Sequence, residues 1–201
     1  MKSAASLPKS YKPFEVIDIK HNHRLGMKVN FFAVGICIAL YYALFKIAPY
    51  FGASLKGYDQ FSPYFVAVGA VVCYVAHEMI RGISMALLCR EVPPNFKADG
   101  LLAYCGSHAF FDCGSYLLIL FAPTVITLLV LCLIIVILGV DMFWSCALLM
   151  IFTMATAAGD LFVAFRLFYK MPTDVMVQDL GVARVFFSAS PDVTPLALKK
   201  I

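Results

Sequence analysis

Three residues that could take part in catalysis or bind a metal lie within five positions of one apolar stretch. They belong to the run His77-Glu78-Met-Ile-Arg81-Gly82. In a helix, residues 77 and 81 are one turn apart on the same face, with Glu78 beside them. If both positions were histidine, the pattern would be H-E-x-x-H, in which two imidazoles bind zinc and the glutamate is the general base. Position 81 is arginine, whose guanidinium stays protonated and has no lone pair for a metal. The motif therefore keeps one ligand and the base, and places a cation where the second ligand would be.

A second acidic residue, Asp160, lies in another apolar stretch, directly after a run of small residues. Ionisable side chains are costly in a membrane span and usually face the interior of a helix bundle. His77 lies about 13 residues before Arg90 and Asp160 about 10 before Lys170, which places both roughly 15–20 Å from the ends of their spans. We therefore expect Asp160 to lie against the helix that carries His77 and Arg81. A carboxylate there would be a suitable third zinc ligand, which leaves one position for water.

The elements that must position these residues are membrane helices. Of the 201 residues, 62% are hydrophobic and only 14% are charged, and the mean hydropathy is +0.87. This composition excludes a nucleic-acid-binding module, a secreted disulfide scaffold and a disordered linker. Four apolar segments are long enough to cross a bilayer: Val29–Phe45, Phe61–Leu88, Ser115–Leu138 and Met142–Phe168. The sequence predicts an all-α integral membrane protein with four transmembrane helices, and a short β-hairpin could form in the cytoplasmic loop or in the tail.

Basic residues predict how the chain is organised around the membrane. We expect a basic N-terminal arm over residues 1–28, a four-helix membrane domain over 29–168 that carries the zincin-like site, and a tail over 169–201. Because Lys and Arg gather in the arm, in the second loop and in the tail, all three are predicted to be cytoplasmic, and the protein is predicted to be multi-pass in the cell membrane. The net charge of +4 suits an anionic inner leaflet and implies nothing about nucleic acid.

The order of several short motifs gives the chain a family resemblance. The motifs are Leu7-Pro8-Lys-Ser-Tyr11, Val16-Ile-Asp18, His77-Glu78-Met-Ile-Arg81-Gly82, Phe121-Ala-Pro123, Gly159-Asp160-Leu161, Met171-Pro172-Thr-Asp174-Val175 and Asp179. In this order they resemble a family of predicted membrane-embedded zincin metallopeptidases, formerly a domain of unknown function, which is distantly similar to the site-2 intramembrane proteases. The resemblance implies that His77 and Asp160 are zinc-ligand positions and that Glu78 is the catalytic base. It also implies that Arg81 stands in place of the second histidine.

Three functions are compatible with these residues. In the first, which we adopt because it pairs every buried charge, Arg81 replaces the charge of the metal, and a weak or non-catalytic homologue acts on or binds membrane or peptide clients. In the second, the chain is an active zinc-dependent membrane metalloprotease, with Cys73 or His108 as a substitute ligand. In the third, the ionisable residues form the relay of a small proton- or ion-coupled transport component. The first hypothesis predicts little bound zinc, and zinc binding after Arg81→His.

Overall fold

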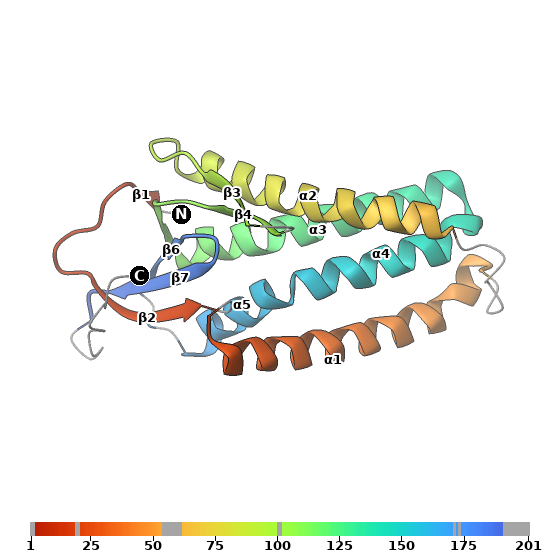
Figure 1. Ribbon diagram of the computed structural model, residues 1–201, viewed down its shortest axis with the longest axis horizontal. Coiled ribbons are helices and arrows are strands. Elements are labelled where there is room, and N and C mark those ends of the chain that lie inside the picture. Colours follow the sequence, from red (N-terminus) through yellow and green to blue (C-terminus); the bar gives the residue numbers. More distant parts are fainter. Residues whose placement is uncertain are drawn as a thin grey trace. The chain divides into compact units, whose positions relative to one another are not determined.

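The computed structural model describes residues 3–18, 21–53, 62–99, 102–170, 172 and 174–190. Helices and short strands alternate along these residues (Figure 1). The helices are α1 (His23–Ile47), η1 (Ala48–Phe51), α2 (Pro63–Leu88), α3 (Cys113–Leu138), η3 (Val140–Met142), α4 (Phe143–Thr156) and α5 (Ala158–Lys170). The strands are β1 (Ser3–Ala4), β2 (Lys12–Asp18), β3 (Asn95–Asp99), β4 (Leu102–Gly106), β5 (Phe110–Asp112), β6 (Met176–Asp179) and β7 (Ala183–Ser188).

Within the described residues, three helical segments are long and apolar enough to cross a membrane: His23–Phe51, Pro63–Leu88 and Cys113–Leu138. Their length and composition agree with a protein embedded in a membrane. The fourth apolar segment of the sequence is not one continuous helix. It is divided at Ala157 into α4 and α5, and the helical segments on the two sides of this break are bent by 50°. Taken together, the two segments are long and apolar enough to cross as one broken span, which would be the fourth crossing that returns the tail to the side of the arm.

A five-stranded antiparallel sheet joins three polar parts of the chain, in the strand order β1-β5-β6-β7-β2. Strands β1 and β2 come from the N-terminal arm, β5 comes from the second loop, and β6 and β7 come from the tail. Figure 1 shows the tail strands β6 and β7 beside strand β2 of the arm, and β2 pairs with β7 along most of its length. Because hydrogen bonds join the three parts directly, all three must lie on the same side of any membrane that the helices cross.

The prediction of an all-α protein with four transmembrane helices is wrong, because the structure contains two sheets as well as helices, and three helices that could span a membrane. The hairpin allowed for in the loop is present as β3 and β4, and the tail also forms a hairpin, β6–β7. The sequence analysis did not predict the strands of the five-stranded sheet that come from the arm and the second loop. Strands β1 and β5 have only two and three residues, which is too short for a pattern of alternation, and their partners are far away in the sequence. Part of the predicted tail, residues 191–201, and part of the first loop, 54–61, lie outside the described residues.

The chain divides into two compact units, and the membrane helices contribute to both. The first contains Met1–Met27, Glu78–Ala122 and Asp160–Ile201; the second contains Lys28–His77 and Pro123–Gly159. In the second unit, Gly69 of α2 lies so close to α4 that an added Cβ would come within 2.6 Å of Leu149. Small residues allow helices to approach in this way.

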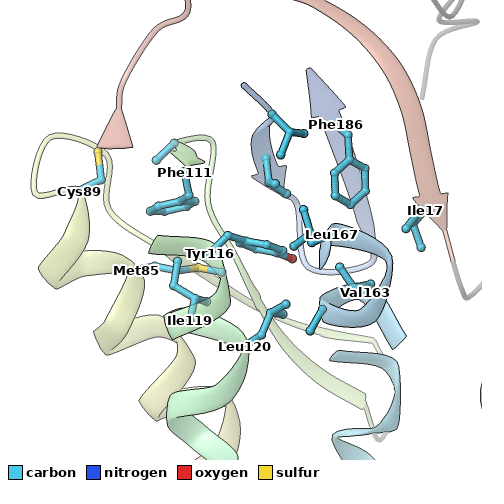
Figure 2. Close-up of a cluster of buried hydrophobic side chains, with 14 of the residues drawn as sticks. Ile17, Met85, Cys89, Phe111, Tyr116, Ile119, Leu120, Val163, Leu167 and Phe186 are labelled. Carbon is cyan, nitrogen blue, oxygen red and sulfur yellow. The ribbon is translucent and has the colours of Figure 1, made fainter. Parts of the chain in front are cut away.

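The core of the first unit is built from the sheet and from parts of α2, α3 and α5. Figure 2 shows Tyr116 of α3 in the middle of this cluster, among Met85 of α2, Leu167 of α5 and Phe111 of β5. The ring of Tyr116 is fully buried. A buried tyrosine usually gives its hydroxyl a hydrogen-bond partner, so a polar group is expected inside the core of the first unit.

Candidate functional site

The run His77–Gly82, which we call the HEMIRG motif, lies on α2. Its residues from Glu78 onward belong to the first unit, and His77 belongs to the second. His77 and Arg81 are each only 5% exposed, although neither side chain is apolar. The helical spacing places them one turn apart on the same face, as the sequence predicts. A buried arginine needs carboxylate partners, because an unpaired charge in an apolar interior is strongly destabilising.

Arg81 has three such partners, two of them within hydrogen-bond distance. Its Nη2 atom lies 2.9 Å from Asp160 Oδ1 and 3.2 Å from Asp179 Oδ2. Its Nη1 atom lies 3.8 Å from Glu78 Oε1, the i,i+3 neighbour on the same helix. The expected approach of Asp160 to the helix that carries Arg81 is confirmed, and it takes the form of a buried, charge-assisted hydrogen bond.

A second guanidinium, from Arg184 of β7, enters the same cluster. It donates to Asp160 Oδ1, the oxygen that also binds Arg81, and its Nε atom lies 3.5 Å from Asp179 Oδ2. Tyr116 completes the cluster by donating its hydroxyl to Asp179 Oδ2 at 2.7 Å. Burial by itself lowers the pKa of Arg184, but its neighbours Tyr116, Asp160 and Asp179 raise this pKa above its usual value. All five side chains of this cluster, which we call the guanidinium–carboxylate cluster, belong to the first unit: Arg81, Tyr116, Asp160, Asp179 and Arg184.

Glu78 is bound from the other side by the β3–β4 hairpin. The backbone N–H of Cys105 in β4 donates to Glu78 Oε2 at 2.8 Å. The hairpin comes this close because residue 82 is glycine: an added Cβ there would overlap the ring of Phe96 and come within 3.0 Å of Cys105 Sγ. Burial and the nearby Glu78 carboxylate raise the pKa of the Cys105 thiol to about 11. The carboxylate that would be the general base in a zincin is thus a hydrogen-bond acceptor for a strand.

The residues present do not fit a zincin metal centre. Among the described residues, no three His, Cys, Asp or Glu side chains come together in a group that could hold a metal ion. The Asp160 carboxylate, which could bind zinc, receives hydrogen bonds from two guanidiniums at its Oδ1 atom. Of the two possible substitute ligands, Cys73 is buried in a core cluster of the second unit, and His108 is exposed in the turn between β4 and β5.

Sequence reasoning missed Arg184, and it named Asp179 only as part of a family motif. Arg184 was counted as one of several basic residues of the tail. A signal for it does exist, because its neighbours in the run Ala183-Arg-Val-Phe-Phe187 are all apolar. A charged residue in a buried strand needs a partner of opposite charge, but the sequence does not say which one.

The fold and the cluster define a protein with membrane-type helices and an antiparallel sheet, in which buried ion pairs lie at the position of a zincin motif. The model of the family described as "Putative zincin peptidase" matches residues 70–176, more than half of the chain. The chain therefore belongs to this family, which supports a peptidase-like function and suggests zinc. No curated protein and no solved structure is significantly similar to it. The matched residues include His77, Glu78, Arg81 and Asp160, whereas Asp179 and Arg184 lie beyond the end of the match.

Proposed function

We propose that this chain is a membrane-embedded member of the zincin peptidase family that does not use a metal for hydrolysis. Instead, it binds membrane or peptide clients. The observation that carries the proposal is the buried contact of 2.9 Å between Arg81 Nη2 and Asp160 Oδ1. A guanidinium cannot bind a metal, and it brings a positive charge to the carboxylate that a metal would need. The Cys105 N–H on Glu78 supports the same conclusion, because it engages the oxygen that would otherwise activate water.

The client half of the proposal rests on strand β3. In the described part of the chain, β3 pairs only with β4, so its other edge carries main-chain groups that an extended peptide can bind by adding a strand. The hairpin lies directly over the HEMIRG helix, with Cys105 and Phe96 against Gly82. A client strand on β3 would therefore lie beside the former catalytic motif without needing a metal.

The proposal includes the location of the protein in the cell membrane, with both termini and the second loop in the cytoplasm. Two observations support it. Basic residues are concentrated in these segments, and their strands share one sheet.

The zinc content of the full-length protein, purified in detergent without a chelator, tests the absence of a metal. We expect far less than about one zinc ion per chain, the stoichiometry of a mononuclear site, and peptidase activity no higher than that of Glu78→Gln. Stoichiometric zinc, with activity that is lost in Glu78→Gln, would contradict the proposal. Loss of that zinc in Cys73→Ser or in His108→Ala would then identify the substitute ligand.

A further inference from the structure

The cluster contains one more cation than the sequence motif accounts for. Arg81 reaches Asp160 and Asp179 from α2, and Arg184 reaches the same two carboxylates from β7. The side chains of the two arginines are 6% and 7% exposed, and those of the two aspartates are 7% and 0% exposed. The cluster holds two guanidiniums and two carboxylates, and Glu78 adds a third carboxylate 3.8 Å from Arg81.

The two guanidiniums meet on one atom. Both donate to Asp160 Oδ1, Arg81 through its Nη2 atom at 2.9 Å and Arg184 through its own Nη2. A metal that bound this oxygen would have to displace both donors. If only Arg81 were replaced, Arg184 would still bind Asp160 Oδ1 and would still place a buried positive charge beside it. A second cation at that distance is repelled strongly when water is excluded.

Arg184 belongs to neither the HEMIRG motif nor the matched part of the family. It is held on β7, whose neighbours on both sides are β2 and β6. The interior position of this strand holds the backbone of Arg184, which pairs with Ile17 on one side and with Asp179 on the other. The backbone of Arg184 is therefore held by the sheet and not by Arg81.

We infer that Arg184 is a second, independent barrier to metal binding, so that zinc binds the family motif of this chain only when both Arg81 and Arg184 are replaced. The inference rests on the proposed metal-free function and deepens it. It also changes the expectation for Arg81→His. The motif alone predicts that this substitution restores a zinc site, whereas the cluster predicts that it does not.

The test compares four forms of the full-length protein in detergent: unmodified, Arg81→His, Arg184→Gln and the double variant. Each is incubated with zinc, desalted and analysed for metal. We expect the first three to hold little zinc and the double variant to approach about one ion per chain, at least a tenfold increase. Incubation with Co²⁺ adds a spectroscopic readout, because tetrahedral coordination by protein ligands produces visible absorption bands that loosely bound metal lacks.

Two controls separate the charge of Arg184 from other effects. The variant that combines Arg81→His with Arg184→Lys keeps a cation on β7 and should remain free of zinc. The variant that combines Arg81→His with Arg90→Gln should also remain free of zinc, because Arg90 is exposed. If the Gln double variant is not monodisperse, a form with Arg81→His, Arg184→Met and Asp179→Asn replaces it, since a buried ion pair is often tolerated when both of its charges are removed together.

The outcomes separate the inference about Arg184 from the proposed function. Stoichiometric zinc in Arg81→His alone overturns the inference about Arg184 and leaves the metal-free function of the unmodified protein standing. A folded double variant without zinc also overturns the inference. Stoichiometric zinc in the unmodified protein overturns the proposed function itself.

Discussion

Arg81 and Glu78 act as structural residues in this molecule, because each binds a neighbouring element where a zincin would bind metal and water. Arg81 joins α2 to Asp160 at the start of α5 and to Asp179 at the end of β6. Glu78 joins α2 to β4 through the Cys105 N–H. Breaking a buried charged pair by removing one partner costs about 3–5 kcal/mol. This cost gives the cluster a reason to persist even without catalysis.

At the same scale, Gly82 determines how closely the hairpin approaches the helix. We expect Gly82→Ala to displace Phe96 and Cys105, because the added Cβ would overlap the Phe96 ring. The Cys105 thiol, now fully buried with a pKa of about 11, should become exposed and ionise more readily. Its labelling by N-ethylmaleimide at pH 7, followed by peptide mass spectrometry, should accelerate about tenfold or more, since each unit of pKa changes the thiolate fraction tenfold.

Gly35→Ala is the matched control for this prediction. An added Cβ at Gly35 would meet nothing within 4 Å, so Cys105 should label as slowly as in the unmodified protein. Unchanged labelling in Gly82→Ala would show that the hairpin does not depend on this contact.

The β3–β4 hairpin is the element that lies against the helix of the HEMIRG motif, with Phe96 and Cys105 next to Gly82. The Cys105 N–H points to Glu78 and therefore away from β3. Cys105 is paired with Phe96, so the two form a non-hydrogen-bonded pair of the antiparallel ladder. The N–H group of Phe96 therefore points to the open edge of β3, and so does the N–H group of Ala98, two residues further on. These donors are available to an added strand.

A proline at position 98 tests the open edge directly. We expect Ala98→Pro to leave the hairpin intact, because proline is tolerated where the N–H faces away from the ladder. It should weaken the binding of a fluorescent, extended Val-Thr peptide about fivefold or more, which corresponds to the loss of one hydrogen bond of about 1 kcal/mol. Fluorescence anisotropy in detergent measures the change. Ala98→Thr keeps the N–H and should bind like the unmodified protein; equal binding by the proline variant would argue against strand addition on β3.

For the whole molecule, the five-stranded sheet decides which segments share one side of the membrane. The arm, the second loop and the tail all contribute strands to it. An ion pair of 2.7 Å between Glu15 of β2 and Arg166 of α5 adds a side-chain link between the arm and the end of a helix. The sheet therefore forms only if the arm, the second loop and the tail lie on the same side of the membrane.

Single cysteines at exposed positions test this arrangement in sealed vesicles. Lys9→Cys in the arm and His108→Cys in the second loop should react with a membrane-impermeant maleimide from the same side. Asp141→Cys, which lies beyond the other end of the spanning helix α3, should react from the opposite side. Peptide mass spectrometry identifies each labelled site in the presence of the seven native cysteines. Reaction of Lys9→Cys and His108→Cys from opposite sides would be incompatible with the sheet.

The sequence by itself determined the features that depend on local pattern. It determined that the chain is rich in membrane-type helices and on which helix the HEMIRG motif lies. It also determined that Asp160 contacts the helix of that motif. Hydropathy, helical spacing and depth can each be read from one continuous segment of the sequence. It also allowed for a short hairpin in the loop or in the tail, and the structure has one in each. These predictions needed no knowledge of which distant segments pair.

Only the tertiary structure decided what Asp160 binds. Arg184 is 24 residues from Asp160 and Asp179 is 98 from Arg81, and both reach the cluster through a sheet whose register depends on short strands from distant parts of the chain. Strand pairing of this kind has no local signature, because register is fixed by partners that the sequence does not name. The motif could therefore indicate that one metal ligand is missing. It could not indicate that a second guanidinium, carried in by β7, occupies the same carboxylate.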